Sequence, residues 1–210
     1  DSVDTALRMA RQYHRLRGEP TRTKFLSLKK GYHGTHWGGA SVNGNNRFRI
    51  TYEPLLPGCF HLPSPYTYRN PFDEMDGAKL AEKIAAAMVD EIEFQDPSTI
   101  AAFIMEPIQG AGGVIVPDAS FMKHMRDICD RYGILMISDE VITGFGRTGD
   151  WTGARHWGVK PDMMTIAKGI TSGYFPVGGV VLGDKVAEVF EKAGPEGSIW
   201  TGYTYSAHPV

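Results

Sequence analysis

The sequence predicts an α/β fold, in which crossover helices pack on a largely parallel central sheet. Short apolar runs with the length of buried strands recur along the 210 residues, and stretches with helical periodicity alternate with them. Polar or charged side chains directly follow three of these runs, as they do at the ligand-binding edge of an open α/β sheet. No internal repeat or low-complexity tract interrupts the alternation. We therefore expect residues 1–210 to form a single domain.

The first helix is expected over residues 4–16, because apolar residues recur on one face while arginines lie elsewhere. Gly18 and Pro20 then stop the helix. The next apolar run, Lys24–Leu28, has the length of a short strand. The chain therefore opens with a helix followed by a strand.

A loop rich in glycine and aromatic residues follows at 31–41, with the sequence GYHGTHWGGAS. It is too irregular for a helix or a strand, and a loop directly after a strand often carries function. Packing within the loop explains Tyr32, His33 and Trp37 equally well. Residues 43–72 are rich in Pro, Gly and Tyr and show no sustained period. We expect them to form a long ordered excursion over the surface or across a subunit contact.

Two helices and a strand are expected between residues 73 and 133. Apolar residues spaced by four predict an amphipathic helix over about 73–94. The run TIAAFIM at 99–105 is typical of a buried strand. A second helix is expected over about 118–132, with Gly133 as its C-terminal stop.

Three more strands and one helix complete the pattern. Residues 134–137 and 163–167 are apolar runs of strand length, and residues 177–182 are a further candidate. Asp184 is placed to cap a helix that runs to Phe190. The alternation of strands and helices thus continues to the end of the chain.

The charge balance and the cysteine content argue against several classes of function. Lys and Arg number 22 against 24 Asp and Glu, a formal net charge of −2 with both signs mixed along the chain. This balance favours neither nucleic acid nor an anionic membrane surface as a partner. No apolar run approaches the roughly 20 residues of a membrane span. Cys59 and Cys129 are isolated, so we expect no disulfide framework, no metal site and a reducing, cytoplasmic location.

Polar side chains follow three of the predicted strands: Glu106 with Gln109, Asp139 with Glu140, and Lys168 alone. If the strands are parallel neighbours, these groups meet at one edge of the sheet. Desolvation there would lower the pKa of Lys168 and make its amine a nucleophile for carbonyl groups. Asp139 could bind a protonated ring nitrogen. The alternative is an Asp139–Lys168 salt bridge that only closes the edge of the sheet.

Two glycine-rich segments resemble nucleotide-binding motifs only in part. GFGRTG at 144–149 matches GxGxxG, but no helical period follows it and Asp162 precedes a strand rather than ending one. GAGG at 110–113 lacks the GK[ST] ending of a phosphate-binding loop. A nicotinamide-dependent oxidoreductase is therefore the weaker alternative. Arg147 could recognise a carboxylate or simply be solvated. Near the chain's end, an imidazole and hydroxyls could bind a phosphate: Thr201, Thr204, Tyr205, Ser206 and His208.

Four motifs in order resemble the class III aminotransferases: YHG at 32–34, EPIQGAGG at 106–113, DEVITGFGRTG at 139–149 and AKGI at 167–170. The likeness covers essentially all 210 residues and is nearest to the ω-amino acid and amine aminotransferases that use pyruvate. Members of this family are pyridoxal-phosphate enzymes of fold type I. The resemblance therefore implies a three-layer sandwich with a mostly parallel central sheet.

The resemblance also implies roles for individual residues. Lys168 would form a Schiff base with pyridoxal 5'-phosphate and later carry a proton between substrate and cofactor carbons. Asp139 would pair with the pyridinium nitrogen. Val141 and Tyr32 would pack on opposite faces of the ring, with His33 beside Tyr32.

Three further residues have implied roles around the ring. Glu106 and Gln109 would lie near its edge, where they polarise the phenolic oxygen or hold neighbouring groups. Thr204 would reach the phosphate in the partner subunit, because the family's site lies at a homodimer interface. The resemblance further implies that a phosphate-binding loop precedes this chain and that a small domain follows it. We expect the chain to be the central part of a large cofactor-binding domain.

The expected reaction is the transfer of an amino group from an ω-amino acid or amine, such as β-alanine or taurine, to pyruvate or a similar 2-oxo acid. Ile142, where ornithine-type relatives tend to carry Gln, disfavours an ornithine-like enzyme. The alternatives are another class III enzyme, with a different donor or a mutase or decarboxylase outcome, and a catalytically silent chain.

Overall fold

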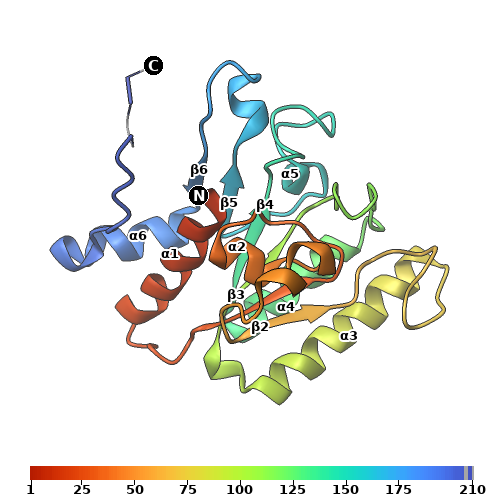
Figure 1. Ribbon diagram of the computed structural model, residues 1–210. Coiled ribbons are helices and arrows are strands. Elements are labelled where there is room, and N and C mark those ends of the chain that lie inside the picture. The colour runs from red at the N-terminus through yellow and green to blue at the C-terminus, as the bar shows by residue number, and fades with distance from the viewer. Residues whose placement is uncertain (206–207, 210) are drawn as a thin grey trace.

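The computed structural model describes residues 1–205 and 208–209 and contains a six-stranded sheet in the order β2-β1-β3-β4-β5-β6 (Figure 1). The pairs from β2 to β5 are parallel, and β6 runs antiparallel to β5. The α/β fold with a mostly parallel sheet is therefore confirmed. The strands are β1 Lys24–Leu28, β2 Cys59–Leu62, β3 Ile100–Met105, β4 Leu135–Asp139, β5 Met163–Ile166 and β6 Gly179–Leu182.

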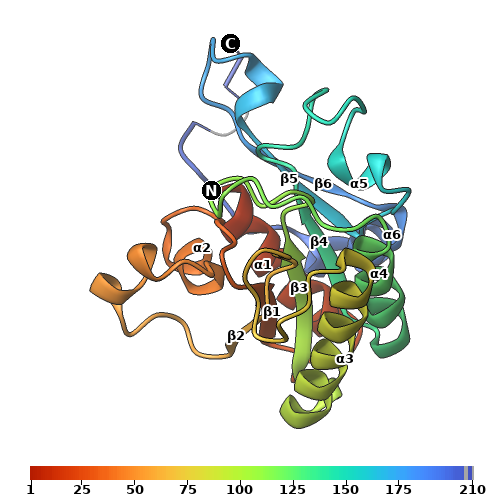
Figure 2. The ribbon, with the colours of Figure 1, turned by 90° about the vertical axis from the view of Figure 1, so that its right-hand side faces the viewer.

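Helices cover both faces of this sheet and make three layers, as Figure 2 shows with the sheet nearly edge-on. One face packs against α3 (Gly77–Gln95) and α4 (Phe121–Tyr132), and the other against α1 (Ser2–Leu16) and α6 (Asp184–Lys192). Every residue of β3 and β4 is buried. Such two-sided burial explains why both strands are near-continuous apolar runs rather than alternating ones.

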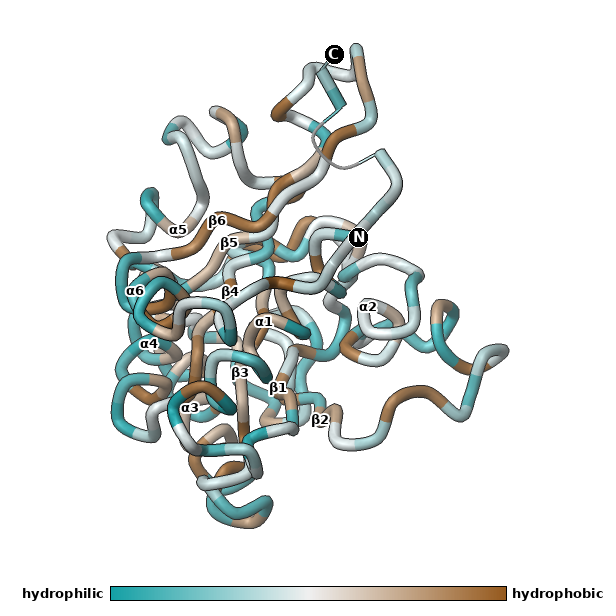
Figure 3. The backbone as a smooth tube through the Cα atoms, turned by 90° about the vertical axis from the view of Figure 1, so that its left-hand side faces the viewer, coloured by the Kyte–Doolittle hydropathy of each residue, from teal (hydrophilic) through white to brown (hydrophobic). Residues whose placement is uncertain are grey.

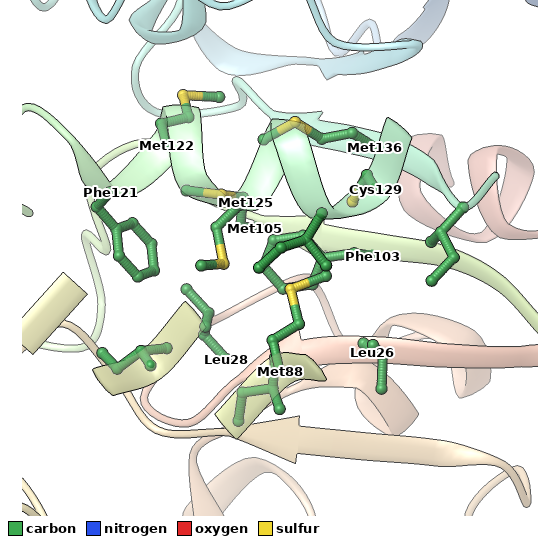
Figure 4. Close-up of a cluster of buried hydrophobic side chains, with 14 of the residues drawn as sticks. Leu26, Leu28, Met88, Phe103, Met105, Phe121, Met122, Met125, Cys129 and Met136 are labelled. Atoms are coloured by element: carbon green, nitrogen blue, oxygen red, sulfur yellow. The ribbon is translucent and has the colours of Figure 1, made fainter. Parts of the chain in front are cut away.

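Alternate residues of β3 enter the two different cores. Phe103 and Met105 pack with α3 and α4, whereas Ala102 and Ile104 pack with α1. Figure 4 shows the first core, where methionine side chains from helices and strands lie near Phe103. In Figure 3, α3 carries both hydrophobic and hydrophilic segments, as expected for a helix with one face on the core.

Most predicted elements are confirmed within a few residues. The four α3 residues spaced by four (Leu80, Ile84, Met88 and Ile92) are all fully buried. Gly133 ends α4 in the left-handed conformation, with a φ of 66°, which a residue without a side chain adopts at no steric cost. Asp76, rather than a residue near 73, caps α3 by accepting a hydrogen bond from the Lys79 N–H.

Some local predictions are wrong. The glycine-rich loop contains a short helix, α2 (Trp37–Val42), and the segment 43–72 contains the edge strand β2. A short helix, α5 (Gly153–His156), follows the GFGRTG segment. These elements have four to six residues, too few for a period to be recognised. The N-cap of α6 is Gly183, since Asp184 is already the first residue of the helix; the Asp184 carboxylate pairs with Lys160 at 3.0 Å.

Neither cysteine forms a disulfide, and in the described residues no helix is long and apolar enough to cross a membrane. Burial raises the pKa of the Cys59 thiol to about 11 and that of the Cys129 thiol to about 12. Both thiols are therefore protonated at neutral pH and poor nucleophiles.

His61 on β2 should make the fold sensitive to acid. Burial lowers the pKa of His61 to about 4, and the Arg49 guanidinium adds to the shift. Arg49 Nη1 donates to His61 Nε2 at 2.6 Å, which requires a neutral ring. The unfolded chain takes up this proton near pH 6.5, so stability present above pH 6.5 is lost as the pH falls toward 4. Because the side chain is partly exposed, we expect a loss of about 2 kcal/mol.

Urea unfolding of the full-length protein at pH 7 and at pH 4 measures this loss. In His61→Gln the side-chain carbonyl can still accept from Arg49 but does not titrate. The variant should therefore lose about 2 kcal/mol less than the parent over the same interval. Parallel pH profiles for the two proteins would contradict the assignment.

Candidate active site

The loops that follow β1, β3, β4 and β5 lie at one edge of the sheet, because these four strands are parallel neighbours. The loop after β1 carries Tyr32 and His33, and the loop after β3 carries Glu106. Asp139 is the last residue of β4, and Lys168 comes two residues after β5. The predicted convergence of these strand ends is confirmed.

Asp139 is the centre of a buried hydrogen-bonded cluster. Its side chain is only 4% exposed. The Oδ2 atom lies 2.7 Å from His33 Nδ1, and Oδ1 accepts from the Thr165 hydroxyl at 3.0 Å and the Val141 N–H at 3.2 Å. A carboxylate has about four lone-pair directions, so one remains for a further donor. This arrangement suits a cationic N–H.

The His33 side chain is fully buried, and its Nε2 has no hydrogen-bond partner among the described residues. Because the Asp139 carboxylate only accepts, the His33 ring donates to it from Nδ1. The hydrogen bond to Asp139 is therefore the one that the His33 ring makes among the described residues. His33 acts on the carboxylate alone and fixes its orientation.

Glu106 ties two of the loops together. Its Oε1 accepts from the Tyr32 N–H at 2.8 Å, and its Oε2 accepts from the Gly110 N–H at 2.9 Å. Burial raises the pKa of the Glu106 carboxyl, although the nearby His33 ring and these two N–H groups oppose the shift. A Cβ at Gly110 would lie 2.6 Å from Ile142 Cδ1. A side chain at Gly110 would therefore force the Ile142 side chain to move where the loops after β3 and β4 touch.

Gln109 is 1% exposed and forms hydrogen bonds with a different part of the chain. Its amide oxygen accepts from the Ser64 hydroxyl, and its Nε2 donates to the Lys29 carbonyl at 2.9 Å. Of the two roles expected for this residue, the contacts favour holding neighbouring groups. Ser64 lies in the segment after β2, where nothing in the sequence pattern pointed to the site.

Glu140 is fully buried and holds the loop after β4 in place. Its carboxylate accepts four hydrogen bonds, from the hydroxyls of Ser138 and Thr143 and from the N–H groups of Gly153 and Ala154. The last two are the first N–H groups of α5. In a dinucleotide-binding fold the GxGxxG segment would open a helix whose N-terminus binds a pyrophosphate. Here the carboxylate occupies that position, so the dinucleotide hypothesis is wrong.

Lys168 lies outside the buried cluster. It is exposed, it has a φ of 47°, and it begins a short 3-10 turn, Lys168–Thr171. The burial expected from its position after a strand is therefore absent in this chain. The alternative of an Asp139–Lys168 salt bridge is also wrong: the ring nitrogen that bonds the Asp139 carboxylate is Nδ1 of His33.

The remaining predicted site residues are less enclosed. Tyr32 and Val141 are half-buried, and the Tyr32 ring packs edge-on against Phe48 at 4.8 Å between centroids. Thr204 is exposed in a turn near the end of the chain. Ser206, also named as a phosphate candidate, lies outside the described residues.

Thr165 was missed as a site residue. It is the one hydroxyl-bearing residue of the apolar run at 163–167 and lies directly opposite Asp139 in the β4–β5 register. A polar residue within a buried strand needs a partner. That signal was present in the sequence, but the partner became identifiable only with the strand pairing.

The whole chain, residues 1–210, matches the family model of the class III aminotransferases. The chain belongs to this family. It is 42% identical to a putrescine–pyruvate aminotransferase and 39% identical to a β-alanine–pyruvate aminotransferase, both from Pseudomonas aeruginosa. Each alignment covers 213 residues and 100% of this chain, but only 45% and 47% of the two enzymes. The chain thus spans about half the length of these relatives.

A solved relative has the same fold. The crystal structure of an amine transaminase from an uncultivated Pseudomonas species, in its pyridoxal-phosphate-bound form, is 50% identical and superposes with a TM-score of 0.97. The match covers 100% of this chain and 47% of that one. The class III fold predicted from the four motifs is therefore confirmed for this chain.

Proposed function

We propose that the protein containing this chain is a pyridoxal-phosphate-dependent aminotransferase. It moves an amino group from an ω-amino acid or amine to pyruvate or a similar 2-oxo acid. The observation that carries the proposal is the Asp139 carboxylate, which is held by three donors and keeps one acceptor direction for a ring N–H. The pyruvate enzymes among the relatives support the acceptor.

The residues at this edge of the sheet fit the cofactor. Asp139 would hold the ring nitrogen, and the half-buried Tyr32 and Val141 would contact the two faces of the ring. Lys168 is an exposed amine at the same edge and would bind the cofactor covalently. Thr204 would serve the phosphate in a partner subunit, which makes a homodimer the expected assembly.

The chemistry divides between the cofactor and the protein. When bound, pyridoxal phosphate supplies an electron sink for the negative charge that develops at the donor carbon. Lys168 Nζ would take the proton from the donor carbon as a general base and would then donate it, as a general acid, to a carbon of the cofactor. Asp139 keeps its position because His33 and Thr165 hold both of its oxygens. Glu106 keeps the Tyr32 loop in place.

Borohydride reduction tests the proposal directly. The full-length protein is incubated with pyridoxal phosphate, reduced and digested, and its peptides are mapped by mass. We expect the reduced pyridoxyl group on Lys168 and not on Lys160, an exposed lysine that pairs with Asp184. Modification at another lysine, or none, would overturn the proposal. A donor panel with pyruvate and 2-oxoglutarate as acceptors then identifies the substrates.

Thr165→Val should weaken cofactor binding about tenfold. The change removes the hydroxyl that donates to Asp139 Oδ1 and keeps the shape, and a hydrogen bond to a charged group contributes about 1.5 kcal/mol or more. Equilibrium titration of the full-length protein with pyridoxal phosphate measures the effect. The matched control is Thr99→Val, which removes a hydroxyl bonded to backbone carbonyls at the opposite end of the sheet. Equal Kd values for the two variants would contradict the role of Thr165.

A further inference from the structure

Asn43 is a completely buried polar residue to which neither the sequence motifs nor the proposed mechanism assigns a role. Its side-chain amide holds the backbone of the loop after β1 at two points. The Oδ1 atom accepts from the His33 N–H, and Nδ2 donates to the Gly34 carbonyl at 2.8 Å. Both groups of the amide are thus used on the loop backbone, one on the peptide unit before His33 and the other on the peptide unit after Gly34.

Two glycines bring Asn43 to this loop. A Cβ at Gly39, on α2, would lie 2.4 Å from the His33 carbonyl oxygen. A Cβ at Gly44 would lie 2.1 Å from the Leu28 carbonyl oxygen, at the end of β1. A side chain at Gly39 would push α2 away from the loop after β1, and one at Gly44 would push the chain after α2 away from the end of β1. The glycines therefore allow α2 and the residues after it to pack closely on β1 and its following loop, which puts Asn43 within reach of His33.

The backbone of Asn43 is itself held by hydrogen bonds. It is the C-cap residue of α2, and its N–H donates to the Gly39 carbonyl at 3.1 Å. Arg49 Nη1 donates to the carbonyls of Ser41 and Asn43, both at 3.0 Å. The backbone of Asn43 is therefore fixed at both ends, and its amide is a rigid support rather than a mobile contact.

We propose that Asn43 is a positioning residue for Asp139 and acts through His33. The contacts form one path: Asn43 fixes the His33 backbone, and the His33 ring fixes Asp139 Oδ2. His33 is fully buried and its Nε2 has no partner among the described residues, so Asp139 and the backbone are what orient its ring. The inference rests on the proposed function, because it concerns how Asp139 is presented to the cofactor ring.

Removing the Asn43 amide should make the positions of His33 and Asp139 less fixed. Without Asn43 the His33 N–H and the Gly34 carbonyl lose their partners, and the loop can shift toward other acceptors and donors. A shift of about 0.5 Å is enough to degrade a preorganised site. By analogy with supporting residues around bound ligands, we expect the affinity for pyridoxal phosphate to fall about 10-fold or more. The pH titration of the bound cofactor's absorbance should shift as well, because the contact with Asp139 changes.

The test compares Asn43→Ala and Asn43→Ser with Asn70→Ala in the full-length protein. Asn70 is a matched control: its Oδ1 accepts from the Phe72 and Glu74 N–H groups and its Nδ2 donates to the Glu74 carbonyl, in a loop before α3. Asn43→Ser keeps a polar group and serves if the alanine variant does not fold. We expect both Asn43 variants, but not Asn70→Ala, to raise the Kd for pyridoxal phosphate and to shift the absorbance titration.

A double-mutant cycle separates action through His33 from a general loss of structure. If Asn43 acts through His33, adding Asn43→Ala to His33→Ala should weaken cofactor binding no further. Fully additive effects would overturn the inference, and so would Asn43 variants that match Asn70→Ala. Failure of the unmodified protein to bind pyridoxal phosphate would instead overturn the proposed function. The two failures are therefore distinguishable.

Discussion

Lys168→Ala should lower kcat for transamination by about 10⁴-fold or more, because it removes the amine proposed to transfer the proton. Cofactor binding should persist in weaker, non-covalent form, since Asp139 and its three donors are untouched. The measurement is kcat of the full-length protein with an amine donor and pyruvate. Absorbance and equilibrium titration of the same samples report the retained cofactor.

Two controls make the result for Lys168 specific. Lys168→Arg keeps the positive charge but not a nucleophilic amine, and it should be as inactive as the alanine variant. Lys160→Ala removes an exposed lysine from a surface ion pair and should leave kcat unchanged. Activity above about 1% of the parent in Lys168→Ala would contradict the role, because general acid–base catalysis alone contributes about 10²-fold or more.

The central part of the fold could be predicted because its signals are strong. β3, β4 and β5 are apolar runs that polar residues follow at once, and α3 repeats apolar residues at intervals of four. These patterns are consequences of burial on both faces of a sheet or on one face of a helix. The convergence of Glu106 and Asp139 followed from the parallel strand ends.

The finer structure of the site depends on contacts between segments that no local pattern encodes. The edge strand β2 has only four residues and is mostly half-buried, so it carries no long apolar run. Asn43 is recognisable as a support only after α2 has packed on β1. Glu140 looked equivalent to Asp139 in the sequence, yet its four partners make it a structural residue.

Glu140→Ala should destabilise the protein by about 4 kcal/mol, the largest loss we expect from a polar substitution. The carboxylate is fully buried, and its removal leaves two hydroxyls and two N–H groups without their acceptor. Each unsatisfied buried donor costs about 1–3 kcal/mol, partly offset where water enters the cavity. The free energy of unfolding of the cofactor-free full-length protein, from urea titration at pH 7, measures the loss.

Glu140→Gln distinguishes the acceptor role from the effect of volume. The amide keeps one oxygen acceptor, but its NH₂ group faces two donors, so the loss should be about 2 kcal/mol. The control is Glu188→Ala, which removes an exposed carboxylate paired with Lys192 and should change stability little. If Glu140→Ala were as mild as this control, Glu140 would not hold α5. Residues 144–152, which are part of the connection between β4 and α5, should become more sensitive to proteolysis in Glu140→Ala, because the anchor at Gly153 is lost.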